Sequence, residues 1–419
     1  MTKILLVSKD GVGASFLPRL MEEGHNVTYY LLKDQYAGVL DGIVPKPIHK
    51  KPDFSNFDLV LFDISGNAHL AEEALKVTPT IGDGDLNTEL EENRVFGIQV
   101  MEECGINVPP YEEFADLNEA KRFIRKTNKR FVFKPNGDQS TACTYVSKSP
   151  EDMLRHLDRL SSETKGEEFI LQEVVQGTEI STEGWFNGEE FFLINSTLEE
   201  KKLMNDNKGP NTGCAGNLVW TYKQGTGNPY IFVEGLSKLK DFLHQYNYRG
   251  MIDLNTIIGD RLYGLEWTPR FGYDAAYTLF NLISSNLGDF LGAIASGSTP
   301  DYEIKGLFSA AIRLGIPPYP SEIKGKHPEG VPIEGIEPED CVRDCYLYDA
   351  CISRGELVTC GVSGMVAVPV GKGDTINQAF LRVQGRVDKI QIPNMMYRTD
   401  LEKTTYKRYE DLDREGWLS

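Results

Sequence analysis

Long hydrophobic runs and an excess of basic residues are both missing from this chain of 419 residues. The longest apolar stretches, such as Ile4–Val7, are far shorter than the ~20 residues of a membrane-spanning helix. The N-terminus has no apolar segment long enough for a secretory signal, so we expect a cytoplasmic protein. The formal net charge of −18 disfavours nucleic acid and anionic membranes as partners, which leaves small molecules as the expected ligands.

Cysteine is also sparse, with seven residues and no Cys-x-x-Cys pair. Four of them lie between Cys341 and Cys360, but neither regular ligand spacing nor a nearby pair of histidines accompanies them. Free thiols in a reducing compartment are therefore favoured over a zinc site. A composition of 40% apolar and 25% charged residues is typical of a folded protein, and the length predicts about three domains.

The first ~90 residues alternate between strand-like and helix-like segments, which predicts a doubly wound α/β domain over residues 1–90. The expected strands are Ile4–Val7, Val27–Leu32 and Leu59–Phe62, and the expected helices are Leu17–Glu23 and Ala68–Lys76. Gly11 and Gly13 follow the first strand, but Phe16 stands where a dinucleotide fingerprint has its third glycine. A tight turn is favoured there over a loop that contacts phosphate.

After Asn93 the strand–helix alternation gives way to helices with capping signals, which suggests two further domains, over residues 91–298 and 299–419. The predicted elements of the central domain are helices over 94–104, from Asp116 and from Ser149–Pro150, and strands over 130–134 and 169–175. The last region begins near the turn-rich segment 296–300 and carries strands at 357–359 and 365–370 and a helix at 379–384.

The segment from Met251 to Thr268 contains two apolar-rich runs on either side of Gly259-Asp260, which predicts a hairpin with a two-residue turn. In that register Ile258 pairs with Arg261, and Asp253 lies directly opposite Glu266. Two carboxylates so placed repel one another, and a divalent cation such as magnesium would remove the penalty. Thr268 points to the same face and could add an oxygen ligand. The alternative is a solvent-facing pair whose repulsion is screened.

Three nearby features are candidate phosphate contacts. Arg270 follows the hairpin directly, although it could equally pair with surface acids. Lys134 ends a predicted strand, where a lone lysine is often only solvated. The segment Gly209–Gly216 combines glycines with Asn211 and Thr212, the composition of an anion cradle or of an ordinary loop.

Together these motifs resemble the ATP-grasp superfamily, and specifically the phosphoribosylamine–glycine ligase family. Gly209–Gly216 is similar to the family's Gly-Pro-Asn-Thr-Gly-Gly-Met-Gly segment, and Glu266–Tyr273 to its Glu-Phe-Asn-x-Arg-Phe-Gly-Asp metal motif. Gln172–Glu179 resembles the hinge that grips adenine and ribose, while Leu357–Gly361 and Tyr397–Asp400 resemble the closing segments. The resemblance implies a central ATP-grasp fold with a mobile lid at about 130–182 and an α+β C-terminal domain.

Several positions depart from the family pattern. Arg94 replaces a lysine that contacts ATP, Thr268 replaces a metal-binding asparagine, and Ala142 stands at the lysine position of the loop over the phosphates. Gly11–Ser15 replaces the loop associated with the sugar-phosphate amine, and Ser363 replaces an arginine. The pocket for the amine therefore differs from that of the family.

The resemblance implies roles for individual residues. The ATP-binding candidates are Arg94, Lys134, Gln172, Glu173, Val175 and Glu179, and the catalytic candidates are Arg270 and Lys201. The candidate ligands of Mg²⁺ or Mn²⁺ are Glu266, Thr268 and Asp253. The substrate-binding candidates are Gly11, Gly13, Asn211, Thr212 and Gly213.

The leading hypothesis is an ATP-dependent carboxylate–amine ligase that forms an amide from glycine and phosphoribosylamine through an acyl phosphate, acting as a monomer or small homo-oligomer. One alternative keeps this chemistry with another amine or amino acid. A second alternative, suggested by Ala142 and Thr268, is a non-catalytic nucleotide-binding regulator.

Overall fold

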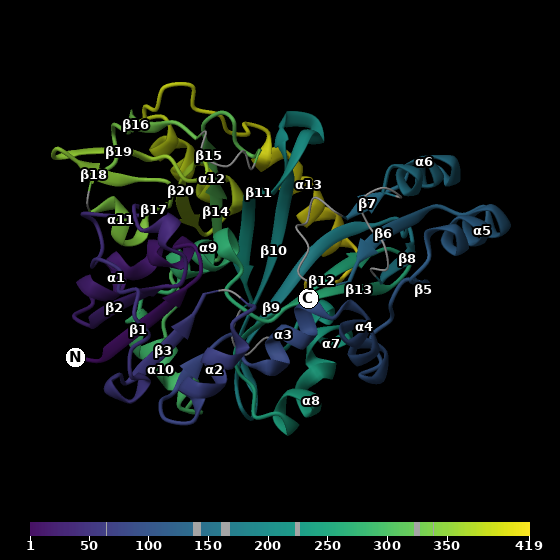
Figure 1. The fold of residues 1–419 in the computed structure, drawn as a ribbon, viewed down its shortest axis with the longest axis horizontal. Coiled ribbons are helices and arrows are strands. Elements are labelled where there is room, and N and C mark those ends of the chain that lie inside the picture. Colours follow the sequence, from purple (N-terminus) through teal and green to yellow (C-terminus); the bar gives the residue numbers. More distant parts are fainter. Residues whose placement is uncertain (64, 137–143, 161–167, 223–226, 322–326, 338) are drawn as a thin grey trace.

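The computed structural model describes residues 1–63, 65–136, 144–160, 168–222, 227–321, 327–337 and 339–419 (Figure 1). Its strands form a parallel N-terminal sheet, a small sheet in a projecting subdomain, a large central sheet and a short C-terminal sheet. The multidomain α/β class predicted from the sequence is confirmed. In the described part of the chain, no helix is both long and apolar enough to cross a membrane.

The N-terminal domain is the parallel sheet that the alternating pattern predicts, in the order β2-β1-β3-β4. Its elements are β1 (Lys3–Ser8), α1 (Leu17–Glu22), β2 (Asn26–Leu31), β3 (Leu59–Phe62), α2 (Ala68–Leu75) and β4 (Thr80–Ile81). Alternate residues of β1 pack into different clusters: Ile4 and Leu6 lie in one, Leu5 and Val7 in another. Both faces of the sheet are thus covered, as expected of strands with continuous apolar runs.

A second unit projects from the body of the molecule at the right of Figure 1. Its sheet has the order β5-β8-β6-β7 and is covered by two helices. The elements are β5 (Tyr111–Phe114), α5 (Leu117–Thr127), β6 (Phe131–Pro135), β7 (Tyr145–Val146), α6 (Pro150–Leu160) and β8 (Phe169–Glu173). Asp116 caps α5 by accepting the Glu119 N–H at 2.8 Å, as the capping pattern predicts. This unit, with an apolar cluster of its own, is called the lid subdomain below.

The large sheet runs through the predicted central and C-terminal regions without a break, in the order β13-β12-β9-β10-β11-β14-β20-β15, with β17 paired to β20. Its strands are β9 (Thr178–Asn187), β10 (Phe191–Met204), β11 (Lys208–Thr221), β12 (Arg249–Ile258), β13 (Leu262–Thr268), β14 (Phe308–Ile312), β15 (Leu314–Gly315), β17 (Cys345–Leu347) and β20 (Met365–Gly373). β9 belongs to this sheet and not to the lid subdomain.

Helices pack around the large sheet and connect it to the other units. They are α3 (Asp85–Glu92), α4 (Arg94–Glu103), α7 (Tyr230–Glu234), α8 (Lys240–Gln245), α9 (Tyr273–Leu282), α10 (Leu287–Ala295), α11 (Asp340–Arg343), α12 (Ile376–Val387) and α13 (Leu401–Arg414). The short sheet contains β16 (Glu329–Pro332), β18 (Cys351–Ser353) and β19 (Glu356–Cys360). Trp185 of the sheet packs edge-on against Phe290 of α10, at 5.1 Å between ring centroids.

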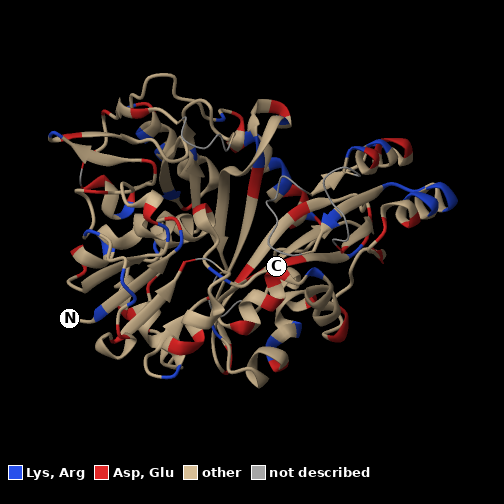
Figure 2. Ribbon diagram, viewed as in Figure 1, with Lys and Arg blue, Asp and Glu red and all other residues tan. Residues whose placement is uncertain are grey.

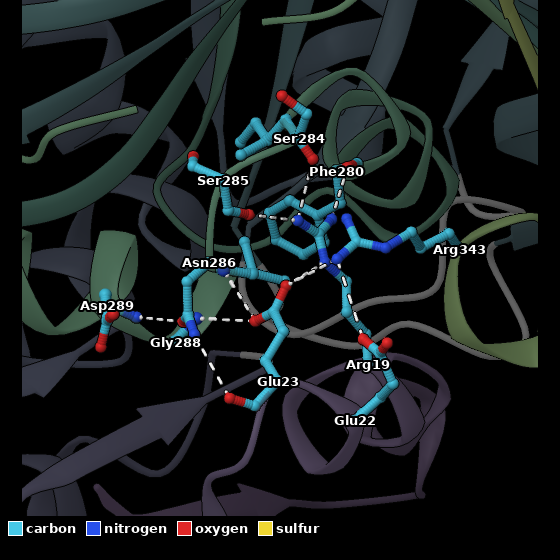
Figure 3. A network of polar contacts seen from close by, with 12 residues as sticks. Arg19, Glu22, Glu23, Phe280, Ser284, Ser285, Asn286, Gly288, Asp289 and Arg343 are labelled. Carbon is cyan, nitrogen blue, oxygen red and sulfur yellow. Dashed lines mark hydrogen bonds and ion pairs between the residues drawn. The ribbon is translucent and has the colours of Figure 1, made fainter. Parts of the chain in front are cut away.

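A buried polar network fixes the N-terminal domain on this body (Figure 3). The fully buried guanidinium of Arg19 in α1 donates to the carbonyl oxygens of Phe280, Ile283 and Ser285 at 2.5 to 2.9 Å. Its Nε pairs at 2.8 Å with Glu23, whose carboxylate also accepts the N–H of Leu287 at the start of α10. The Arg19–Glu23 ion pair therefore provides hydrogen-bond partners both for carbonyl oxygens at the end of α9 and for an N–H group at the start of α10.

We expect Arg19→Ala to lower the free energy of unfolding by about 3–5 kcal/mol, because the change removes the donors to three carbonyl oxygens and leaves Arg343 as the remaining ion-pair partner of the buried Glu23 carboxylate. Denaturant titration of the full chain measures this loss. The matched control is Arg261→Ala at an exposed turn, which should change the free energy by less than about 0.5 kcal/mol. Equal stability of the two variants would contradict the importance assigned to the network.

Candidate active site

The predicted hairpin between β12 and β13 exists, but its predicted register is wrong. Ile258 pairs with Leu262, so the turn holds three residues and not two, and its Gly259 N–H donates to the Arg261 carbonyl at 3.0 Å. A bulge after Asn255 shifts the pairing once more. As a result Asp253 lies opposite Thr268, and Glu266 lies opposite Asn255.

The candidate metal ligands nevertheless share one face of the hairpin. The two shifts add to two residues, and side chains two residues apart point the same way. The Asn255 amide donates to Asp253 Oδ2 at 2.9 Å and to Thr268 Oγ1 at 3.4 Å. Asp253 and Glu266 are therefore diagonal neighbours on this face, with Asn255 between them.

Glu266 is held ionised by surrounding positive charge. Enclosure in the site alone would raise the pKa of Glu266, but three nearby cations outweigh this effect and lower the pKa to about 2. The cations are Arg94, Lys134 and Lys201. Arg94 Nη1 lies 3.1 Å from Glu266 Oε2 and forms an ion pair with it. Acidic and basic segments lie close together where the long strands meet the lid subdomain (Figure 2).

Lys134 is the penultimate residue of β6 and points toward the hairpin. Its Nζ donates to the Leu265 carbonyl at 3.3 Å, and burial lowers the pKa of this amine to about 8. Arg94, at the start of α4, donates from Nε to the Pro135 carbonyl at 2.8 Å. The strand that carries Lys134 is thereby fastened to the helix that carries Arg94.

Several of these residues line a narrow cleft between the lid subdomain, the hairpin and helices α3 and α4. Its lining residues are Leu90, Glu91, Arg94, Gly97, Ile98, Met101, Lys134, Ile170, Leu265, Glu266 and Trp267. Apolar side chains form one part of the cleft and charged groups the other. Such a lining suits a ligand with an aromatic base and an anionic end.

The predicted hinge residues lie where the lid subdomain joins the large sheet. Gln172 of β8 is 1% exposed, and among the described residues its Nε2 has no hydrogen-bond partner. Glu173 forms an ion pair with Lys129 at 2.5 Å. Val175 lies between β8 and β9, and Glu179 of β9 forms an ion pair with Lys201 of β10. The four candidates therefore lie at the junction of β8 and β9, and their role in binding ATP stays a prediction.

The segment Gly209–Gly216 is not a loop, as its composition suggested, but part of β11. This strand returns antiparallel to β10, with Asn211 opposite Lys202. Thr212 Oγ1 donates to the Lys201 carbonyl at 3.0 Å, and Gly213 adopts a positive φ of 78° that favours glycine. The two long strands extend beyond their neighbours as an arm of the sheet (Figure 1).

Arg270 lies after the hairpin, and Glu91 of α3 holds it. Its Nη2 approaches Glu91 Oε1 at 2.7 Å, Nε also bonds the carboxylate, and the guanidinium carbon lies 4.9 Å from the centre of the Tyr273 ring. The lid loop with Ala142 lies outside the described residues, so that position is not placed.

The glycine turn after β1 is already bonded within the protein. Gly11 has a φ of 91°, and its N–H donates to Ser8 Oγ at 2.8 Å, while the Gly13 N–H donates to Asp63 Oδ2 at 2.8 Å. Burial, with Asp10 nearby, raises the pKa of Asp63 to about 7. These contacts fit the tight turn favoured by the sequence. A phosphate at the two N–H groups would have to displace protein oxygens.

Sequence reasoning missed two polar residues of the site, Glu183 and Asn255. Glu183 lies in β9 directly opposite Asp253 in β12, and burial raises the pKa of Glu183 to about 8. Burial also raises the pKa of Asp253, with a further contribution from the Glu183 charge. The sequence of β9 has no regular alternation of polar and apolar residues, and its pairing with β12 joins segments about 70 residues apart, so no local pattern marks Glu183.

Comparison with known proteins agrees with this geometry. Residues 92–253 match the family model described as phosphoribosylglycinamide synthetase, ATP-grasp (A) domain. The chain is 24% identical over 345 residues to the phosphoribosylamine–glycine ligase of Halalkalibacterium halodurans, covering 79% of this chain and 77% of that protein.

Solved structures share the fold. The crystal structure of phosphoribosylamine–glycine ligase from Thermotoga maritima superposes with a TM-score of 0.74 at 19% identity, covering 95% of this chain and all of that one. The biotin carboxylase domain of Hydrogenobacter thermophilus 2-oxoglutarate carboxylase, in complex with MgADP and bicarbonate, gives a TM-score of 0.64 at 14% identity, covering 100% and 96%. Residues 92–253 thus match an ATP-grasp domain model, and most of the chain is similar in sequence and fold to phosphoribosylamine–glycine ligases.

Proposed function

We propose that the chain is an ATP-dependent, ADP-forming ligase that joins glycine to phosphoribosylamine through an acyl phosphate, giving glycinamide ribonucleotide. The observation that carries this proposal is the charge cluster in the cleft. Arg94, Lys134 and Lys201 surround one ionised carboxylate, Glu266, at the junction of the lid subdomain and the large sheet. The names of the relatives support the same reaction.

The residues of the hairpin fit a magnesium or manganese ion. Glu266 offers an ionised carboxylate, and Thr268 offers a hydroxyl oxygen on the same face. Hard divalent ions prefer such oxygens and usually share their coordination with substrate phosphates. A bound ion would neutralise negative charge on the terminal phosphates of ATP.

The cations of the cleft would act on the phosphates directly. Lys134 and Arg94 come from the lid side, and Lys201 comes from the sheet, so a γ-phosphoryl group among them would be surrounded by positive charge. Arg94 is paired with Glu266 and would turn from this carboxylate to the phosphate. Such groups stabilise the charge that develops as the amino-acid carboxylate attacks phosphorus and ADP leaves.

The amine then attacks the acyl phosphate, and phosphate leaves as the amide forms. This step needs the two reactants to be positioned and water to be excluded, and it needs no serine or cysteine nucleophile. The lid subdomain has its own apolar cluster, so it can close over the cleft as a body. Arg270, held by Glu91, would add positive charge near the phosphates.

A second candidate keeps this chemistry and changes the amine. The observation that favours it is the Asp63 carboxylate on the Gly13 N–H, at the turn that replaces the family's sugar-phosphate loop. The relatives do not favour the third possibility, a regulator without turnover, because those named above are enzymes.

We expect the purified chain to release ADP and phosphate when it is given Mg-ATP, glycine and phosphoribosylamine. Glu266→Ala should lower kcat by at least about 100-fold, because it removes the ionised oxygen ligand from the site. A coupled assay for ADP measures the turnover of the wild-type chain and of Glu266→Ala. The matched control is Asp260→Asn in the exposed turn of the same hairpin, which should keep full activity. Unchanged turnover by Glu266→Ala would contradict the assignment of Glu266 as a metal ligand. Release of ADP only with another amine would favour the second candidate.

The activity should also fall at alkaline pH, since the Lys134 amine has a pKa of about 8 in the free protein. It is charged below that pH and neutral above it, so kcat/KM for ATP should be level up to pH 7.5 or so and decline with a midpoint near 8. Lys134→Arg keeps its charge through this range and should lack the decline. The same midpoint in both enzymes would assign the titration to another group.

A further inference from the structure

Two polar side chains of α3 hold the segment that follows β13. The side-chain amide of Asn87 donates to the Pro269 carbonyl, which also accepts the Tyr248 hydroxyl at 3.2 Å. Glu91 lies four residues after Asn87, on the same face of the helix, and forms an ion pair with Arg270. The helix therefore holds two consecutive residues directly after the hairpin, and Arg270 is the charged one.

The ion pair between Glu91 and Arg270 is bidentate. Nη2 of Arg270 lies 2.7 Å from Oε1 of Glu91, and Nε lies 3.0 and 3.1 Å from the two carboxylate oxygens. The two side chains are only 16% and 22% exposed, so water screens their attraction weakly. The Tyr273 ring packs on the guanidinium, with 4.9 Å between its central carbon and the ring centre. Glu91 and Tyr273 thus fix one edge and one face of the guanidinium.

These contacts leave donors of Arg270 unused. Nε and Nη2 each donate to Glu91, and Nη1 donates to the Phe271 carbonyl at 3.1 Å. Each terminal nitrogen of arginine carries two N–H groups, so one on Nη1 and one on Nη2 have no acceptor among the described residues. A planar guanidinium that is fixed along one edge presents its remaining donors in a set direction, which suits a phosphoryl group.

Glu91 itself lines the cleft, together with the cations Arg94 and Lys134. A carboxylate repels the phosphates of ATP, so its presence there is not explained by direct binding of the nucleotide. Its oxygens bond within the protein: both contact Arg270, and Oε2 also accepts the hydroxyl of Ser65 at 2.6 Å, from the loop after β3. The contacts of Glu91 therefore point to a role that is exerted on Arg270.

We propose that Glu91 is a positioning residue, which fixes Arg270 so that the free donors of its guanidinium meet the charge that develops on the transferred phosphoryl group. This inference rests on the proposed ligase function. A donor that is held in place beforehand needs no reorganisation when the charge appears, and it therefore lowers the barrier more than a mobile donor does. Glu91 touches neither substrate in this role and acts through Arg270.

The first test is the steady-state kinetics of Glu91→Gln, which keeps the size of the side chain and removes its charge. We expect kcat to fall at least about 10-fold while the KM for ATP does not rise, because the change affects a contact made in the transition state and removes an acid from the cleft. The matched control is Glu89→Gln at an exposed position of the same helix, which should keep the wild-type kcat. A raised KM for ATP with unchanged kcat would overturn the proposal.

A double-mutant cycle tests whether Glu91 acts through Arg270. Arg270→Ala alone should lower kcat at least as much as Glu91→Gln does. Adding Glu91→Gln to Arg270→Ala should cause no further loss, because the residue to be positioned is already absent. Losses that multiply in the double variant would overturn the proposal, since the two residues would then act independently.

A conservative variant separates positioning from a structural role. Glu91→Asp keeps the charge on a shorter side chain, so it should recover part of the kcat that is lost in Glu91→Gln. Denaturant titration checks that the variants are folded, and Glu91→Asp takes the place of Glu91→Gln in the cycle if the latter does not fold. Equally low kcat in folded Glu91→Asp and Glu91→Gln of equal stability would overturn the proposal, because the charge at this position would then not matter.

The outcomes also distinguish this inference from the function on which it rests. If the wild-type chain releases ADP and Glu91→Gln releases it at the same rate, the inference is wrong and the ligase function stands. If the wild type releases no ADP with any amino acid and amine, the proposed function fails, and the inference fails with it.

Discussion

The pairing of β12 with both β9 and β13 is the constraint on which the site depends. It brings residues from three strands onto one face of the large sheet: Glu183, Asp253, Asn255, Glu266 and Thr268. Their side chains share this face because each strand alternates, and the bulge after Asn255 adds one residue without losing the alignment. A sheet buried on the opposite face cannot slip by one residue, since a slip would place these polar groups in the apolar core.

Charge balance is the second condition that the fold satisfies. Glu266 is surrounded by cations, whereas no lysine or arginine in the described part of the chain forms an ion pair with Glu183 or Asp253, two residues further along the sheet. The same face thus has one end where cations surround a carboxylate and another end where two acids face each other.

Much of the fold was predictable from the sequence because its signals are local. The βα alternation of residues 1–90, the cap at Asp116 and the hairpin around Gly259 all depend on residues within a few positions of one another. The register of the hairpin was not predictable, since Arg261 joins the turn and a bulge follows, and neither has a sequence signature. The longer turn and the bulge each shift the pairing by one residue, and a total shift of two residues leaves every side chain on the same face. The prediction that Asp253 and Glu266 share one face was therefore unaffected.

Two buried acids of the structure have partners that are distant in sequence. Glu183 becomes informative only when β9 lies beside β12, and Asp63 only when its carboxylate reaches the Gly13 N–H 50 residues away. Both are buried acids, and burial of a charge is tolerated where hydrogen bonds or a ligand compensate for lost hydration. Among the described residues, Asp63 and Asp253 each keep one carboxylate oxygen without a hydrogen-bond partner and use the other within the protein. Asp63 accepts the Gly13 N–H and so closes the turn after β1, whereas Asp253 accepts the Asn255 amide within β12, on the face that carries Glu266.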